Sequence, residues 1–136
     1  MVALQRVIQE DRTGCGFACV ATIADTTYSR VKRMACLEFG WESRKVFYTG
    51  YHHLNRLLES LGCTTERGRG IKKWESLPDL AIVAINPDET ERNWHWVVFA
   101  REGGSSFVID PRSKCERRTD FWRMRLRSCI PVRRCK

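Results

Sequence analysis

Cys15 has the sequence setting of a reactive thiol. It follows Gly14 at the start of a helical pattern, where unpaired backbone N–H groups and the helix dipole stabilise a negative charge. The small residues beside it, Gly14 and Gly16, would let a substrate backbone approach closely. A thiolate nucleophile also needs a base, a group that orients the base, and donors for the oxyanion. The sequence offers a candidate for each.

The base must come from three histidines. His52 and His53 lie at the charged start of a helical pattern, and we interpret them as a surface pair. His95 stands between Trp94 and Trp96 at the start of a strongly apolar strand. Such a histidine is often only packed or hydrogen-bonded, but a carboxylate within reach makes it a candidate general base.

Asp110 is the carboxylate that a hairpin would bring to His95. If Gly103 and Gly104 form a two-residue turn, Val97 faces Asp110 across the hairpin. Because side chains alternate along a strand, His95 and Asp110 then project from one face as diagonal neighbours, about 7–8 Å apart at the backbone. A register shift of one residue would separate them, and Asp110 would then merely end a strand.

The oxyanion donors are the backbone N–H of Cys15 and the side-chain amide of Gln9, six residues earlier. A glutamine in isolation proves nothing, so this role depends on the other residues. Cys19 lies one turn beyond Cys15 on the apolar face of the same helix and is interpreted as core. A redox pair of Cys15 with Cys19 is the alternative.

Three helices are expected in the first half of the chain, and they must position Cys15. The first covers residues 14–24; the second covers about residues 29–39, with Thr27 as its cap and Gly40 at its end. Thr49 caps the third helix, and Gly62 stops it. The apolar stripe of this third helix consists of Leu54, Leu57, Leu58 and Leu61.

The second half changes to the pattern of strands, and it must position His95 and Asp110. A turn at residues 86–88 follows the first strand, and residues 102–105 connect the next two. Helices followed by strands predict an α+β fold, with the N-terminal helices packed on a C-terminal antiparallel sheet. The expected strands are residues 80–85, 94–100, 106–110 and 128–132.

The charge of the chain is concentrated at one end. Its 136 residues include 24 Lys and Arg against 16 Asp and Glu, a net charge of +8. Residues 112–136 contain ten basic and two acidic residues, so this segment alone carries +8. We interpret it as a solvated strand and terminus, and an acidic partner is the alternative. Nucleic-acid binding is not expected as the main function, because no zinc-finger, RNP or basic-zipper pattern accompanies the charge.

Seven cysteines at irregular spacing do not form the framework of a secreted, disulfide-rich domain. Most are expected to be small buried side chains in a reducing compartment. No cofactor and no metal are predicted, because neither Cys15 with Cys19 nor His52 with His53 has the partners of a four-ligand zinc set. The charged first twelve residues exclude the usual secretory signal, and no apolar run reaches the roughly 20 residues of a membrane helix. A cytoplasmic location is expected.

Three stretches, in this order, resemble the bacteriocin-processing cysteine peptidases, the double-glycine leader peptidase family of the papain-like group. They are residues 9–19 (QEDRTGCGFAC), 95–99 (HWVVF) and 108–111 (VIDP). The family pattern has a Gln six residues before the nucleophilic Cys, a Cys-Gly-x-Ala-Cys string, a His followed by an apolar pair, and an Asp-Pro about fifteen residues later. The resemblance covers about residues 5–112 and leaves the basic C-terminal segment outside.

The resemblance implies a single papain-like domain over residues 1–136. It makes Cys15 the nucleophile, His95 the general base and acid, Asp110 the residue that orients His95, and Gln9 the oxyanion donor. The implied activity is a thiol hydrolase that cleaves amide bonds of a peptide or protein substrate. Gly14 departs from the family, which often has an acidic or polar residue there. The transporter segments and ATP-binding motif that usually accompany the family are not in this sequence, so a stand-alone domain is expected.

Other functions stay open. The chain could bind a peptide without cutting it, or act as a basic interaction protein through residues 112–136. The same triad could deamidate a glutamine or transfer an acyl group. Alternation along the strand directs Trp96 away from His95, so Trp96 is not expected to be a contact. Aromatic residues that could line a substrate groove, although such residues are more often core, are Phe17, Tyr48, Trp94 and Trp96.

Overall fold

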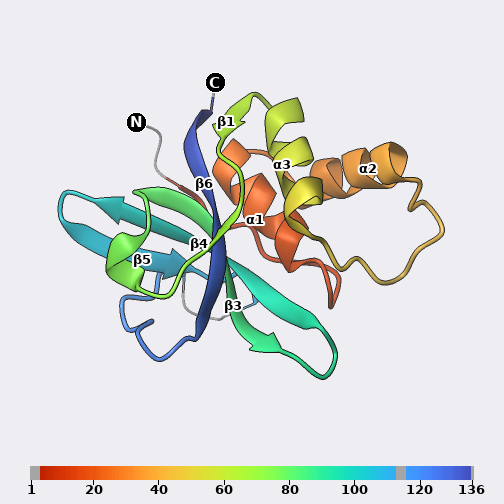
Figure 1. Cartoon of the computed structure of the whole chain (residues 1–136). Helices are drawn as coiled ribbons and strands as arrows, with labels where there is room; N and C mark the ends of the chain where they lie inside the picture. The colour runs from red at the N-terminus through yellow and green to blue at the C-terminus, as the bar shows by residue number, and fades with distance from the viewer. Residues whose placement is uncertain (1–3, 113–115, 136) are drawn as a thin grey trace.

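A computed structural model describes residues 4–112 and 116–135 (Figure 1). Within these residues three helices come first and an antiparallel sheet of six strands follows, so the predicted α+β class is confirmed. The helices are α1 (Cys15–Ala24), α2 (Tyr28–Phe39) and α3 (Tyr51–Ser60), and a short 3₁₀ turn covers Trp74–Ser76. The strands are β1 (Cys63–Thr65), β2 (Arg69–Gly70), β3 (Leu80–Asp88), β4 (Asn93–Glu102), β5 (Ser105–Ile109) and β6 (Leu126–Cys135).

The helix ends follow from capping residues, with one correction. Thr27 caps α2 by accepting a hydrogen bond from the Arg30 N–H at 3.2 Å, and Gly40 ends the helix in the left-handed conformation, as predicted. The prediction that Thr49 caps α3 was wrong, because Gly50 occupies the cap position. The Gly50 N–H donates to the side chain of His53, and the Thr49 carbonyl accepts from the Trp96 indole instead.

The hairpin of β4 and β5 has the predicted register. Glu102 pairs with Ser105 and Val98 pairs with Ile109, so the turn consists of Gly103 and Gly104. Both glycines have positive φ angles, 54° and 84°, which a two-residue hairpin turn requires at both positions. Asp110 therefore directly follows the end of β5, opposite the N-terminal part of β4.

The strand before this hairpin is longer than predicted. The turn expected at residues 86–88 is part of β3, whose pairing with β4 is irregular between Ile85 and Asp88. Asn86 adopts a positive φ of 50°, and its N–H donates to the Arg125 carbonyl at 2.8 Å. Asparagine tolerates this conformation, so the sequence signal for a turn marks a bulge here.

The basic C-terminal segment is not a solvated tail. Its strand β6 lies between β1 and β3 in the sheet order β1-β6-β3-β4-β5, and β2 also pairs with it. Figure 1 shows this strand running through the middle of the molecule. Five consecutive residues, from Ser128 to Val132, are buried because both faces of the sheet are covered. The interpretation as a solvated strand and terminus is corrected accordingly.

Two apolar cores cover the two faces of the sheet. On the first face the helices contribute Phe17 and Leu54, which pack with Trp96 and Ile130. The second face is covered by the 3₁₀ turn and the segment before β6, whose Trp74 and Phe121 pack with Phe99 of β4. All three helices lie on one side of the sheet in Figure 1, and α1 packs directly against β4. This packing brings the start of α1 to the strand that carries His95.

The cysteines differ from expectation at one pair. Cys63 of β1 and Cys135 of β6 face each other across the antiparallel pairing and form a disulfide. The expectation that the thiols are mostly free side chains is therefore wrong for these two. The described free cysteines are Cys15, Cys19, Cys36 and Cys129, and Cys115 lies outside the described residues. In the part of the chain that the structure describes, no helix has the length and apolar character needed to span a membrane.

Candidate active site

Cys15, His95 and Asp110 come from three distant stretches and lie together in the structure. Cys15 is the first residue of α1, His95 is the third residue of β4, and Asp110 follows β5. A further contact joins these stretches, because the Gln9 N–H donates to the Pro111 carbonyl at 3.2 Å. The loop that leads into α1 is thereby fixed to the segment that carries Asp110.

The His95 ring is oriented by a hydrogen bond to Asp110. Its Nε2 lies 2.7 Å from Oδ1 of the carboxylate, and both side chains are largely buried. The same oxygen accepts the Arg112 N–H at 2.9 Å, which fixes the carboxylate in turn. The Nδ1 atom of His95 is buried and has no hydrogen-bond partner among the described residues. Nδ1 is therefore the ring nitrogen available to Cys15.

The thiol and the imidazole shift each other's pKa. Burial by itself raises the pKa of Cys15, but its interactions with the His95 ring outweigh this effect and lower the pKa below the ordinary value. Burial by itself lowers the pKa of His95, but its interactions with Asp110 and Cys15 raise the pKa to about 9. Each shift favours the charged form of the group, thiolate at Cys15 and imidazolium at His95.

Asp110 is charged at neutral pH. Burial would raise its pKa, but the His95 ring and the neighbouring Arg112 lower the pKa below the ordinary value. Burial raises the pKa of Cys19 well above its usual range, so this second thiol of α1 is protonated core. Cys15 and Cys19 are both free, and they differ in pKa because only Cys15 interacts with His95.

The glycines beside Cys15 have a different role from the one predicted. A Cβ atom at Gly14 would lie 1.8 Å from the Tyr28 hydroxyl, and one at Gly16 would lie 2.3 Å from Oγ1 of Thr49. These Cα atoms thus face other parts of the chain, and the expectation that they admit a substrate backbone is corrected. Their small size allows α1 to pack closely, which fixes the position of Cys15.

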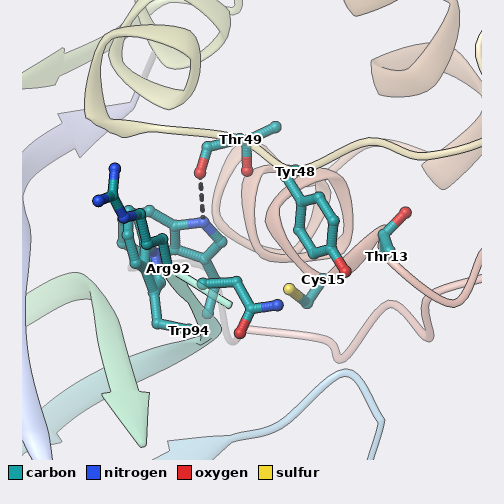
Figure 2. Close-up of a pocket in the computed structure, with 8 residues that line it drawn as sticks. Thr13, Cys15, Tyr48, Thr49, Arg92 and Trp94 are labelled. Atoms are coloured by element: carbon teal, nitrogen blue, oxygen red, sulfur yellow. Dashed lines mark hydrogen bonds between the residues drawn. The ribbon is translucent and has the colours of Figure 1, made fainter. Parts of the chain in front are cut away.

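A narrow cavity of about 40 Å³ leads to Cys15. Figure 2 shows Cys15 with Tyr48 and Thr13 on one side of the cavity and Arg92 and Trp94 on the other. Thr13 accepts a hydrogen bond from the Phe47 N–H at 2.8 Å, which places the Tyr48 segment over the start of α1. The remaining lining residues are Thr49, Asn93 and Trp96.

The aromatic residues near the site divide between cavity and core. Tyr48 and Trp94 line the cavity, whereas Phe17 is completely buried. Trp96 also lines the cavity, although it lies on the opposite face of β4 from Val97 and Phe99. The strand alternation places Trp96 on the helix side of β4, and this is the side from which Cys15 is reached. Its indole N–H donates to the Thr49 carbonyl at 3.1 Å, a bond visible in Figure 2.

Gln9 lies beside the loop before α1. Its amide nitrogen donates to the carbonyls of Asp11 and Arg12, both at 2.9 Å, and its amide oxygen is buried without a partner. The loop is anchored further by Asp11, which accepts from the Tyr28 hydroxyl at 2.6 Å and pairs with Lys32. In this state both amide hydrogens of Gln9 stabilise the loop rather than point to a free site.

His52 and His53 are not the surface pair that the sequence predicts. His52 is exposed, but the ring of His53 is half-buried between Phe39 and Trp41, with centroid separations of 4.7 Å to each. Burial lowers the pKa of His53 to about 4, and its Nδ1 accepts the Gly50 N–H. This histidine therefore supports the start of α3 as a neutral side chain.

Several lining residues have no signal in the sequence. Asn93 belongs to no motif, and Arg92 lies in the connection between β3 and β4. Only the pairing of distant segments brings them to Cys15. Within residues 4–112 and 116–135, no group of three or more His, Cys, Asp or Glu side chains is placed to hold a metal ion.

The fold is similar to that of a peptidase domain. No protein-family model matches this chain, and no curated protein matches it. Among solved structures, the peptidase domain of Streptococcus ComA, a bifunctional ABC transporter involved in a quorum-sensing pathway, has a TM-score of 0.64 at 17% sequence identity. The match covers 97% of this chain and 99% of that chain. At this identity the likeness shows the fold and leaves the chemistry to the site.

Proposed function

We propose that this protein is a papain-like cysteine peptidase that hydrolyses amide bonds of a peptide substrate. Residues 1–136 would form one catalytic domain. Cys15 is the nucleophile, His95 is the general base and acid, and Asp110 is the positioning residue for His95. The observation that carries the proposal is the 2.7 Å hydrogen bond from His95 Nε2 to Asp110, which directs the unpartnered Nδ1 toward a thiol of lowered pKa.

The reaction has two stages. The thiolate of Cys15 attacks the carbonyl carbon, a C–S bond forms, and the carbonyl electron pair moves to oxygen. As the tetrahedral intermediate collapses, the C–N bond breaks and Nδ1 of His95 gives its proton to the leaving amine. Water then attacks the thioester while Nδ1 takes its proton, and the carboxylic acid leaves as the thiolate of Cys15 is restored.

The oxyanion is stabilised by the start of α1 and by Gln9. The backbone N–H of Cys15 lies at the positive end of the helix dipole and has no partner within the helix. For Gln9 to donate as well, its amide must exchange one of its bonds to Asp11 or Arg12 for a bond to the oxyanion. The amide oxygen of Gln9 is buried without a partner, so the amide is not held by a bond at that atom.

A peptide is the favoured substrate for two reasons. The structural neighbour is a peptidase domain, and the thiol lies at the end of a narrow cavity beside a more open hollow of about 410 Å³. An extended chain fits such an arrangement, with its scissile carbonyl over Cys15. The proposed imidazolium form of His95 supplies the proton that an amide leaving group requires and that a thioester or ester does not.

The first test is the reactivity of the thiols. At neutral pH, iodoacetamide should modify Cys15 at least tenfold faster than Cys36, the partly exposed thiol of α2 that has a raised pKa. Peptide mapping by mass spectrometry identifies the modified residue. His95→Ala should remove the preference, whereas Cys36→Ala should leave the rate of modification at Cys15 unchanged. Equal modification of the two cysteines would contradict the proposal.

The second test distinguishes cleavage from deamidation. A peptide mixture is incubated in ¹⁸O-labelled water, and the products are sequenced by mass spectrometry. Hydrolysis of the chain places the label at a new C-terminus, whereas deamidation places it in a glutamate side chain. Labelled new termini with the parent protein and none with Cys15→Ala are expected. The proposal fails if neither product depends on Cys15.

A further inference from the structure

A wide hollow continues from the catalytic pair away from Cys15. Its volume is about 650 Å³, against about 40 Å³ for the narrow cavity over the thiol. It shares Asn86, His95 and Asp110 with the hollow that contains Cys15, so the two form one trough across the His95–Asp110 pair. Its remaining lining residues are Ile85, Arg118, Asp120, Trp122, Arg123 and Met124.

Trp122 projects into this trough from an anchored turn. The Met124 N–H donates to the Phe121 carbonyl at 2.9 Å, and Phe121 is buried against Trp74 and Phe99. The Trp122 side chain is nevertheless 59% exposed, and its described ring contact is to its neighbour Phe121. An indole held open to water beside a hollow marks a contact surface, because burying it would be favourable.

The chemistry of the site fixes which part of a substrate enters the trough. Cys15 retains the acyl part as a thioester, while Nδ1 of His95 must reach the leaving amine nitrogen to protonate it. The chain that follows the cleaved bond therefore begins over the His95 ring. From there the trough runs past Asp110 to Trp122, so the leaving segment lies along it.

The charges that line the trough favour an apolar residue over a basic one. Asp110 is paired with His95, and Asp120 lies 3.5 Å from the guanidinium of Arg118. Arg123 has no carboxylate partner among the described residues, so the lining carries a net positive charge. Ile85 and Met124 add apolar surface beside the indole.

We propose that this trough is the leaving-group subsite and that Trp122 selects peptides with an aromatic or large apolar side chain at the second residue after the cleaved bond. The inference rests on the proposed function, because it takes Cys15 and His95 as the reacting pair. Trp122 does not touch the reacting atoms and acts on specificity alone.

The test uses the acyl-enzyme, so that the natural peptide need not be known. A small activated ester of a blocked glycine acylates Cys15, and an amine competes with water for the thioester. The amine nitrogen forms the new C–N bond, His95 takes its proton, and the thiolate leaves. We expect glycyl-phenylalanine amide to capture the acyl group about tenfold better than glycyl-glycine amide, the ratio that one aromatic contact of about 1.4 kcal/mol gives.

Trp122→Ala should reduce this tenfold preference to about onefold, measured as the ratio of captured to hydrolysed acyl group for the two amines. Trp122→Gln serves as the second variant, and Leu37→Ala, which replaces another exposed apolar residue in α2, should keep the preference. Equal capture of the two amines by the parent protein, or an unchanged preference in both Trp122 variants, would overturn the proposal. Loss of ester turnover in Cys15→Ala reports separately on the proposed function.

A binding measurement covers the case in which the ester is not turned over. Glycyl-phenylalanine amide is titrated into Cys15→Ala while tryptophan fluorescence and its quenching by acrylamide are recorded. Protection from the quencher in Cys15→Ala, and its loss in the double variant with Trp122→Gln, supports the subsite. Absence of protection in both overturns it.

Discussion

At the scale of single residues, His95 is positively charged because two negative groups flank its ring. Asp110 faces Nε2, and the thiolate of Cys15 faces the other nitrogen. Burial opposes the charge on every member of this group, yet the pKa directions show that mutual attraction prevails. The three side chains therefore titrate as one unit, and substitution of one changes the protonation of the others.

This coupling predicts the pH dependence of ester hydrolysis. The rate should rise as pH passes the lowered pKa of Cys15, because the thiolate forms there, and fall near pH 9 as His95 loses its proton. Asp110→Asn removes a group that raises the pKa of His95, so the falling limb should move to lower pH. The same change should lower kcat by about 10²-fold or more, because the ring is no longer held in the correct tautomer.

The measurement is a profile of kcat/KM against pH for the parent protein and for Asp110→Asn, with Asp79→Asn as control. Asp79 pairs with Arg101 on the surface and is remote from the trough, so its replacement should leave both limbs in place. An alkaline limb that stays near pH 9 in Asp110→Asn would show that this carboxylate does not control the ring.

Local patterns predicted the pairing of His95 with Asp110 better than the surroundings of Cys15. The pairing of His95 with Asp110 depends on one tight turn, and two consecutive glycines determine such a turn locally. The packing of Gly16 against Thr49, by contrast, joins segments that are distant in sequence. The periodicity of one segment does not indicate which residues of a distant segment pack against it. The mistaken roles of Gly14 and Gly16 have this common cause.

At the scale of the elements, the contact of α1 with the segment before α3 determines where Cys15 lies. A Cβ at Gly16 would approach Oγ1 of Thr49 to 2.3 Å and Cδ2 of Leu54 to 3.0 Å. Gly16→Ala should therefore push α1 away from this segment and lower the free energy of unfolding by about 1–3 kcal/mol. Because Cys15 precedes Gly16 directly, ester turnover should fall as well.

Thermal unfolding and ester turnover measure the two effects. Gly70→Ala is the matched control, because a Cβ there meets only the Arg127 carbonyl at 3.9 Å. Thr49→Ala should relieve part of the clash, so the double variant Gly16→Ala/Thr49→Ala should be more stable than Gly16→Ala alone. If Gly16→Ala is as stable and as active as the parent, close packing at this point does not position the nucleophile.

Element boundaries were predictable where a cap or an apolar run defines them. Thr27 and Gly40 delimit α2 by local hydrogen bonds and backbone conformation, which the residue types reveal. At α3 the signal was ambiguous, since Thr49 and Gly50 both qualify as caps. The Thr49 carbonyl accepts a hydrogen bond from the Trp96 indole. Because Trp96 lies in another part of the chain, the sequence around Thr49 does not reveal this contact.

At the scale of the whole molecule, β6 connects β1 with the remaining strands of the sheet. It pairs with β1, which directly follows the helices, and with β3, which leads into the hairpin that pairs His95 with Asp110. The sequence around residues 128–132 predicted a strand, but its central place depends on pairings between residues far apart in the chain. The composition of residues 112–136 favoured a solvated segment, because the arginines that flank the buried residues dominate its net charge.

The disulfide between Cys63 and Cys135 closes this arrangement and provides a prediction at the same scale. The bridge links residues 72 apart, so it removes many conformations from the unfolded chain and should add about 2–4 kcal/mol to the free energy of unfolding. Cys135→Ser should lower the melting temperature of the oxidised protein, and a reducing agent should bring the parent to the same value.

Cys36→Ser replaces a free, partly exposed thiol and should leave both the melting temperature and its response to reductant unchanged. Cys15 is a free thiol and takes no part in the bridge, so thiol reactivity of Cys15 should persist after mild reduction. A melting temperature that does not respond to reductant, together with alkylation of Cys63 and Cys135 in the untreated protein, would show that the bridge does not form. The last strand would then be fixed by its backbone pairing with β1 and β3 alone, and the free energy of unfolding should be independent of redox conditions.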